Sequence, residues 1–224
     1  MIRTRIRDPK KIAKLYTRLS RIYDPFTGHE PRHHREALKL AAIKEGDLVL
    51  EVAVGTGRAV VGIAEAVGQQ GRVYGVDLTE AMLRQAEAKL RKEGLLPKVE
   101  LAQGSAFSLP FEDGKFDVLY NSYMLDLIDT PQILPVLLEF KRVLRPGGEL
   151  VLVNMSKNTK RKTLFEFMCE KGLMTYGNCR PVLAEPLAEQ AGFENIRRAY
   201  RRDFSWLLLT VLTGTEIVLA NKPA

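Results

Sequence analysis

Hydrophobic residues along this chain follow two periods, which predict alternating strands and helices. Short, mostly apolar runs that suit buried strands occupy residues 48–52, 72–76, 98–102, 116–120 and 149–154. Elsewhere apolar residues recur at steps of three or four, which predicts amphipathic helices at residues 60–67, 79–93 and 131–143. The segment 144–148, with one proline and two glycines, predicts a turn that ends the last helix. Strands separated by helices favour a parallel sheet.

Both ends of the chain depart from this alternation. Two helices are expected before the first strand, at residues 9–20 and 29–42. Near the C-terminus, a helix at 182–191 precedes two strand candidates, 195–204 and 215–221, with no helical crossover between them. Such neighbours form an antiparallel pair, which we expect at the edge of the sheet.

Composition restricts the chain to ordinary globular proteins. Its 224 residues, of which 46% are hydrophobic and 27% charged, are enough to bury a core, which excludes a disordered or fibrous chain. Two cysteines, Cys169 and Cys179, are too few for a disulfide framework or a zinc ligand set and fit a reducing compartment. The most apolar stretch, 204–220, contains Glu216 and falls short of a membrane span, and the basic N-terminus has no signal-peptide core. We therefore expect a cytoplasmic protein.

Positive charge is concentrated at the N-terminus. Residues 1–21 contain eight Lys or Arg against one acidic residue, a net charge of +7 that equals that of the whole chain. Apolar residues recur in this arm at helical spacing: Ile12, Leu15, Tyr16 and Leu19. Such a stripe faces either the core or a bilayer surface, and the basic groups suit anionic lipid, nucleic acid or plain solvent. Neither a basic patch interleaved with aromatic residues nor a separate recognition domain is visible, so we expect no nucleic-acid partner.

A strand, a turn of small residues and a helix follow one another from Val49 to Arg58. In a parallel sheet this turn lies at the carboxyl edge, where small residues allow backbone N–H groups to approach a ligand. Asp77 ends the next strand, twenty residues after Gly57, where a carboxylate can accept hydrogen bonds from both ribose hydroxyls. Its plainer role is that of a carboxylate at the start of the following helix. Together these features predict a cofactor that contains a nucleoside.

The loop suits a cationic cofactor better than a dinucleotide. The pyrophosphate-binding pattern requires a third glycine where this chain has Val60. Glu51, at the end of the first strand, would repel a pyrophosphate but can anchor an ammonium group. A Rossmann-type nucleotide-binding oxidoreductase is therefore the second hypothesis.

These residues resemble the class I methyltransferases that use S-adenosyl-L-methionine, and the resemblance covers nearly the whole chain. Its motifs are, in order, Glu51–Gly57, Asp77, Gly104–Ala106, Leu109–Phe111, Phe116–Val118 and Leu144–Gly148. The chain is most similar to the ubiquinone/menaquinone-biosynthesis C-methyltransferases and the soluble bacterial phospholipid N-methyltransferases, which share the pair Tyr23–Asp24.

The resemblance implies the architecture. It predicts a Rossmann-like, doubly wound α/β sheet of seven strands, mostly parallel with an antiparallel C-terminal strand, and helices on both faces. It divides the chain into a basic N-terminal helical segment and lid at residues 1–45 and a class I methyltransferase core domain at 46–224.

The resemblance also implies the residues of the site. Those expected around S-adenosyl-L-methionine are Tyr23, Glu51, Ala53, Gly55, Thr56, Gly57, Asp77, Leu78, Met82, Ser105, Ala106, Phe107 and Asn121. Methyl transfer from a sulfonium is an in-line displacement, which needs a base only where the acceptor must lose a proton. The candidates for catalytic roles are Tyr23, Tyr123 and Asp126. Plainer roles are core packing for Leu78, Met82 and Tyr23, and helix capping for Asp126.

Two positions depart from the family pattern. Ala53 stands where the family has its first glycine, and its methyl group is tolerated if its φ is negative. Ser105 stands in place of an aspartate that accepts from the adenine amino group, although its hydroxyl still accepts one hydrogen bond. Neither change adds bulk or opposite charge, so we expect cofactor binding to be retained.

The methyl acceptor is expected to be small and lipid-like or quinone-like. The N-terminal arm, a basic cluster at 157–162 and the apolar run 206–209 suit peripheral contact with an anionic membrane, although solvated loops and core packing also explain them. A noncatalytic membrane-surface protein is the third hypothesis. No metal is expected, because His29 and His33 have the spacing of a metal pair but no third ligand.

Overall fold

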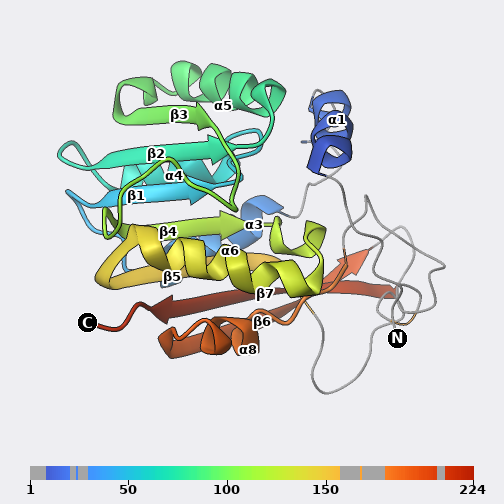
Figure 1. The fold of residues 1–224 in the computed structure, drawn as a ribbon. Helices are drawn as coiled ribbons and strands as arrows, with labels where there is room; N and C mark the ends of the chain where they lie inside the picture. Colours follow the sequence, from blue (N-terminus) through green and yellow to red (C-terminus); the bar gives the residue numbers. More distant parts are fainter. Residues whose placement is uncertain (1–8, 21–23, 25–29, 157–166, 168–179, 206–209) are drawn as a thin grey trace.

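The computed structural model describes residues 9–20, 24, 30–156, 167, 180–205 and 210–224. Its centre is a seven-stranded sheet with the order β3-β2-β1-β4-β5-β7-β6 (Figure 1). The strands are β1 (Leu48–Val52), β2 (Arg72–Asp77), β3 (Val99–Gln103), β4 (Phe116–Ser122), β5 (Leu144–Ser156), β6 (Glu194–Ser205) and β7 (Thr210–Asn221). All pairs from β3 to β5 are parallel, whereas β7 runs antiparallel to both β5 and β6. The predicted mostly parallel sheet with an antiparallel C-terminal strand is confirmed.

Helices cover both faces of the sheet and create two apolar cores. Figure 1 shows α6 (Thr130–Val143) and α8 (Glu185–Gln190) in front of the sheet, and α3 (Glu30–Leu40) and α4 (Arg58–Ala66) behind it. Successive strand residues point to opposite faces, so Val49 joins the core with α3, α4 and α5 (Glu80–Lys92), while Leu50 joins the core with α6 and α8. Strands buried on both faces explain the continuous apolar runs in the sequence.

The order of the strands reverses between β1 and β4. After β3, the chain crosses back to place β4 on the other side of β1, with Val52 opposite Asn121. Ligands of open α/β sheets bind outside the carboxyl ends of the strands at such a switch point. The loops that follow β1, β2 and β4 are therefore the ones that can form a site.

Three predicted boundaries differ from the structure. The segment 144–148 belongs to β5 rather than to a separate turn, because Leu144 pairs with Phe116 and the Gly147 N–H donates to the Lys222 carbonyl. Of the helix predicted at 182–191, only Glu185–Gln190 is helical. Pro186 lacks an N–H and therefore suits the first turn of a helix rather than its interior. The strand predicted to begin at 215 begins at Thr210.

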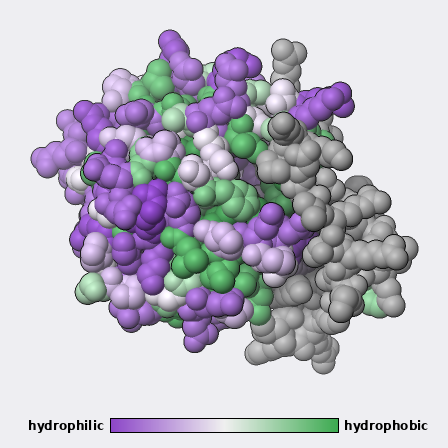
Figure 2. All heavy atoms as spheres, viewed as in Figure 1, coloured by the Kyte–Doolittle hydropathy of each residue, from purple (hydrophilic) through white to green (hydrophobic). Residues whose placement is uncertain are grey.

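The N-terminal helix α1 (Pro9–Leu19) lies at the carboxyl end of the sheet, beside α5 (Figure 1). Figure 2 shows a largely polar face with apolar residues exposed in its middle. Within the described ranges, no helix combines the length and apolar character needed to cross a bilayer. The described residues also form two short 3-10 helices, η1 (Leu96–Lys98) and η2 (Leu125–Leu127).

Candidate active site

The turn after β1 contains three residues with left-handed backbones. Ala53, Gly55 and Gly57 have φ values of +63°, +58° and +82°. The condition under which the Ala53 methyl group would be tolerated without strain, a negative φ, is therefore not met, and the methyl group strains the loop by about 1–2 kcal/mol. The strand geometry causes this, because the Ala53 N–H donates to the Val76 carbonyl at 2.7 Å and the chain must then turn into α4.

The two glycines of the turn serve different purposes. A Cβ atom on Gly57 would lie 2.8 Å from the Ala86 Cα, so this glycine allows α5 to approach the loop closely. A Cβ atom on Gly55 would have no neighbour within 4 Å. Because Gly55 also lines the pocket described below, its missing side chain leaves space for a ligand.

Asp77, the last residue of β2, ties this turn to the start of α5. Its Oδ2 accepts from the Gly55 N–H at 2.9 Å, and its Oδ1 accepts from the Thr79 N–H at 2.8 Å and the Thr79 hydroxyl at 2.9 Å. Burial raises the pKa of Asp77, and these hydrogen bonds partly oppose that shift. The plainer role of Asp77 at the start of a helix is therefore confirmed, while its place in the pocket wall leaves the ribose role open to it.

Glu51 is buried in the sheet next to Asp77. Its side chain is 1% exposed, and neither carboxylate oxygen has a hydrogen-bond partner in the described part of the chain. Burial raises the pKa of Glu51 well above its ordinary value, and the negative charge of Asp77 raises it further. A buried carboxylate in this state is a ready partner for a cation.

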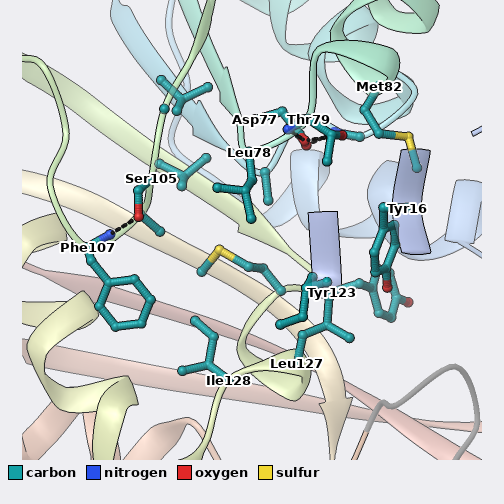
Figure 3. A pocket seen from close by; sticks show the side chains of 18 of the residues that line it. Tyr16, Asp77, Leu78, Thr79, Met82, Ser105, Phe107, Tyr123, Leu127 and Ile128 are labelled. Atoms are coloured by element: carbon teal, nitrogen blue, oxygen red, sulfur yellow. Dashed lines mark hydrogen bonds between the residues drawn. The ribbon is translucent and has the colours of Figure 1, made fainter. Parts of the chain in front are cut away.

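A pocket of about 360 Å³ opens at the switch point, and side chains from several loops line it (Figure 3). Its lining residues are Ile12, Tyr16, Val52, Ala53, Gly55, Val76, Asp77, Leu78, Thr79, Met82, Gly104, Ser105, Ala106, Phe107, Ser122, Tyr123, Met124, Leu127, Ile128 and Gln132. Eight of the predicted cofactor residues are among them. Glu51 and Thr56 line a smaller crevice that shares Ala53, Gly55 and Tyr123 with the pocket wall. The fold therefore brings most of the predicted cofactor residues together around this pocket and the crevice beside it.

Apolar side chains that suit packing against a flat ring line much of the pocket. Leu78 and Met82 line it from the loop after β2 and from α5, and Phe107, 41% exposed, lies at its edge. The Ser105 hydroxyl accepts a hydrogen bond from the Phe107 N–H at 3.3 Å (Figure 3). As a hydroxyl, Ser105 has capacity for one more hydrogen bond to a ligand.

Three predicted residues lie on β4, just after it and on η2, and two of them, Asn121 and Asp126, do not line the pocket. Asn121 is buried and donates from Nδ2 to the Val52 carbonyl at 2.8 Å, so it joins β4 to β1. Asp126 is 1% exposed, and its backbone carbonyl accepts from the Arg180 N–H at 3.1 Å. Tyr123, by contrast, lines the pocket itself.

Asp24 makes contacts with Thr56, Arg58 and Lys89 that were not predicted from the sequence. Its carboxylate accepts from the Thr56 hydroxyl at 2.6 Å and lies 3.1 Å from both the Arg58 Nε and the Lys89 Nζ. Burial acts to raise the pKa of Asp24, but hydrogen bonds from Thr56 and Lys89 together with nearby positive charges hold it below its ordinary value. Asp24 thereby attaches the N-terminal segment to the glycine loop, α4 and α5.

Helix α1 contributes to the site as well. Ile12 and Tyr16 line the pocket, so the apolar stripe of this helix faces the protein, one of the two orientations expected from its pattern. Several predicted features lie outside the described residues: Tyr23, His29, the cluster 157–162, Cys169, Cys179 and the run 206–209.

The geometry therefore defines a ligand of particular chemistry. It offers a buried carboxylate with no hydrogen-bond partner among the described residues for a cation, a second carboxylate beside a glycine turn for hydroxyl groups, and apolar side chains for a planar ring. These are the parts of an adenosyl compound that carries an ammonium group.

Known proteins are similar to this chain in sequence and in fold. Residues 8–196 match the model of the ubiE/COQ5 methyltransferase family. A demethylmenaquinone methyltransferase from Lactococcus lactis subsp. lactis (strain IL1403) is 36% identical over 155 residues, which cover 67% of this chain and 60% of that protein. The chain thus spans about three-fifths of the length of the curated relatives it matches.

Solved structures have the same architecture. A SAM-dependent methyltransferase from Aquifex aeolicus superposes with a TM-score of 0.61 and 25% identity, covering 96% of this chain and 99% of that one. A phosphoethanolamine N-methyltransferase 2 from Haemonchus contortus, in complex with S-adenosyl-L-methionine, has a TM-score of 0.68 and 18% identity, covering 86% of this chain and 53% of that one. At 18% identity the likeness concerns the fold alone.

Proposed function

Because the chain belongs to the ubiE/COQ5 methyltransferase family, we propose that it transfers a methyl group from S-adenosyl-L-methionine to a small quinone-like or lipid-like acceptor. The observation that carries this proposal is the carboxylate of Glu51, which is buried beside the glycine turn without a hydrogen-bond partner among the described residues. An unpartnered buried charge destabilises the fold, and an ammonium group placed against it would offset that cost. The amino-acid part of S-adenosyl-L-methionine carries such a group.

The residues present fit this cofactor. Glu51 would hold the ammonium group, Asp77 would accept from the ribose hydroxyls, and Ser105 would meet the edge of the adenine. When bound, the cofactor supplies a methyl group activated by a positively charged sulfur. The protein supplies alignment and exclusion of water, which for an in-line displacement account for most of the rate enhancement.

A quinone-like acceptor agrees with the far wall of the pocket. Met124, Leu127 and Ile128 form an apolar surface there, and the relative from Lactococcus lactis described above is named as a demethylmenaquinone methyltransferase. An oxidised quinone ring is electron-poor, so the reactive form must be the reduced, dihydroxy ring, whose carbon becomes nucleophilic when a hydroxyl loses its proton. Tyr23, Tyr123 and Asp126 are the candidate groups for that proton transfer.

Residues 1–45 would act as a lid over the core domain at 46–224. Ile12 and Tyr16 line the pocket from this segment, and Asp24 attaches it to the loop and helices that bind the cofactor. Closure of the segment would exclude water from the methyl group before transfer.

A peripheral membrane position would suit an apolar acceptor. Because Ile12 and Tyr16 face the pocket, the exposed side of α1 presents Lys14 and Arg18 to the surroundings. Basic residues on an exposed helix face are attracted to anionic lipids by about 1 kcal/mol each. Salt-sensitive binding to phosphatidylglycerol vesicles, lost in the Lys14→Gln/Arg18→Gln variant, is the expected result, whereas binding that salt leaves unchanged would contradict it.

The test of the function begins with calorimetric titration of the protein with S-adenosylhomocysteine, with NAD as the parallel ligand. We expect micromolar affinity for the first alone, weakened in Asp77→Asn. The second step measures methyl transfer to a short-chain demethylmenaquinone kept reduced with dithionite, with phosphatidylethanolamine vesicles as the lipid alternative. Binding of NAD alone would contradict the proposal and favour an oxidoreductase.

A further inference from the structure

Helix α3 places two consecutive histidines against two tyrosines of the β4 region. His33 Nδ1 lies 2.7 Å from the Tyr123 hydroxyl, and His34 Nδ1 lies 2.9 Å from the Tyr120 hydroxyl. Both histidines are buried, with exposures of 2% and 6%. The pairs differ in what lies beyond the tyrosine, because Tyr120 is fully buried in the core whereas Tyr123 lines the pocket.

The backbone holds Tyr123 in an uncommon conformation at the end of β4. Its φ is +48°, a left-handed value that costs a residue with a side chain about 1–2 kcal/mol. The Tyr123 N–H donates to the Val153 carbonyl at 2.7 Å, which fixes this turn to β5. Strained residues of this kind concentrate at functional sites, where the surrounding structure maintains them.

The Tyr123 hydroxyl meets a second polar group. The Thr215 hydroxyl, on the buried part of β7, lies 3.4 Å from it. Three segments far apart in the sequence, α3, the turn after β4 and β7, therefore converge on the hydroxyl of a tyrosine that lines the pocket. The sequence places His33 in an ordinary amphipathic helix, so only the fold reveals this convergence.

We propose that Tyr123 and His33 form a proton relay for the methyl acceptor. Tyr123 Oη takes the proton from a hydroxyl of the acceptor ring while its own proton passes to His33 Nδ1. The 2.7 Å separation allows the proton to pass from Tyr123 to His33 and back. An imidazole nitrogen accepts a hydrogen bond when it is neutral and donates one when it is protonated. Tyr123 is then a catalytic residue, and His33, which acts through it, is a positioning residue that holds the proton. This inference rests on the proposed function and identifies the residues that accept the proton in that reaction.

Protons and electrons balance in this scheme. Loss of the hydroxyl proton to the relay gives an oxyanion. Its negative charge is delocalised onto the ring carbon, which becomes nucleophilic and attacks the methyl group. The new carbon–carbon bond forms as the carbon–sulfur bond breaks. The electron pair of the broken carbon–sulfur bond stays on the sulfur and neutralises its positive charge. The ring carbon then loses its hydrogen to water as a proton, and the ring oxygen regains a proton from Tyr123 and His33. One proton is released to solvent for each positive sulfur neutralised.

The experiment compares the Tyr123→Phe and His33→Gln variants with Tyr120→Phe, which makes the same chemical change at the tyrosine outside the pocket. Methyl transfer to reduced short-chain demethylmenaquinone and affinity for S-adenosylhomocysteine are measured on each. We expect kcat to fall about 100-fold in the first two variants, with KM and affinity within about twofold of the parent. The double variant should be no slower than the slower single variant, and imidazole should restore part of the kcat of His33→Ala. Tyr120→Phe should keep its kcat.

Each alternative outcome has a distinct meaning. A Tyr123→Phe variant with the parent kcat overturns the relay while leaving the proposed function intact. Equal losses in all three variants, with no rescue by imidazole, assign the histidines a structural role and also overturn it. A parent chain that binds S-adenosylhomocysteine but methylates neither acceptor overturns the proposed function, and the relay with it.

Discussion

Glu51 and Asp77 lie at the carboxyl ends of neighbouring parallel strands, one residue before the end of β1 and at the end of β2, and the negative charge of Asp77 adds to burial in raising the pKa of Glu51. Two carboxylates in such a position are unfavourable for the isolated protein. Asp77 has three hydrogen bonds from Gly55 and Thr79 to stabilise its charge, while Glu51 has none from the described residues. The pair therefore favours a neutral Glu51 in the free protein and a charged Glu51 when a cation binds.

Cofactor binding should release a proton from Glu51. An ammonium group beside the carboxylate lowers its pKa, so a proton held by the free protein leaves on binding, and affinity for S-adenosylhomocysteine should rise as pH increases. Calorimetry in two buffers of different ionisation enthalpy measures the released proton. In Glu51→Gln we expect no release from this site and an affinity about 10- to 100-fold weaker.

The same substitution should stabilise the free protein. Because the folded-state pKa of Glu51 is raised, its deprotonation costs stability once pH exceeds the unfolded-state pKa, and the cost grows until pH passes the folded-state pKa. Glu51→Gln removes this cost, so its free energy of unfolding should exceed that of the parent by about 1–3 kcal/mol at pH 8 and by less at pH 5. Urea denaturation at both pH values tests this, and a difference independent of pH would argue against a titrating Glu51.

Ala53→Gly should stabilise the loop. A φ of +63° strains alanine but not glycine, so removing the methyl group should raise the free energy of unfolding by about 1 kcal/mol. The matched control is Ala59→Gly in α4, where the backbone is helical and we expect a loss of about 1 kcal/mol. Thermal denaturation distinguishes the two, and a loss of stability in both would mean that Ala53 is not strained.

The sequence predicted the sheet well because its signals are local. Buried parallel strands such as Leu48–Val52 read as apolar runs, and the glycines at 55 and 57 mark a turn that needs left-handed residues. The strand ends then place Asp77 and the Ser105 loop beside that turn, since parallel strands end at one edge. Most of the pocket residues beside the glycine turn were therefore predictable from the sequence.

The remaining part of the site depends on long-range packing. Nothing local to His33 shows that it reaches Tyr123, ninety positions away, because its helix has an ordinary amphipathic pattern. The same holds for Asp24, whose partner Lys89 comes from a helix that begins beyond the second strand. The sign of the Ala53 φ was likewise not visible in the sequence, because the hydrogen bond from its N–H to the Val76 carbonyl forms only in the folded sheet.

Asp77→Asn should separate two roles of one side chain. Asparagine keeps the size of the side chain but replaces one acceptor oxygen with a donor, which cannot accept from Gly55 or Thr79 on that side. We expect a loss of about 1–2 kcal/mol in unfolding free energy and at least a tenfold weaker affinity for S-adenosylhomocysteine. Thr79→Ala is the control, since it removes one hydrogen bond to Asp77 and should lower stability more than affinity. Equal affinities of parent and Asp77→Asn would remove the ribose role.

Asp24→Asn should loosen the N-terminal segment from the core. The charge of Asp24 holds Arg58 and Lys89 at 3.1 Å, and asparagine keeps its shape without that charge. We expect faster proteolysis within the N-terminal segment and a severalfold weaker affinity for S-adenosylhomocysteine, both smaller at high salt because exposed ion pairs are screened. Lys89→Met, which removes one partner, should show part of the effect.

The pH dependence of this contact has a defined sign. The folded-state pKa of Asp24 is lowered, so its stabilising effect is complete above the unfolded-state pKa and disappears as pH falls through the folded-state value. Protection of the segment from proteolysis by an acid-active protease should therefore fall below about pH 4 in the parent and change less in Asp24→Asn. The Arg84→Gln variant breaks an exposed ion pair with Glu80 on the same helix as Lys89 and serves as the control. If Arg84→Gln loosened the segment as much as Asp24→Asn, the effect would belong to surface charge in general, and Asp24 would not be the attachment of the lid.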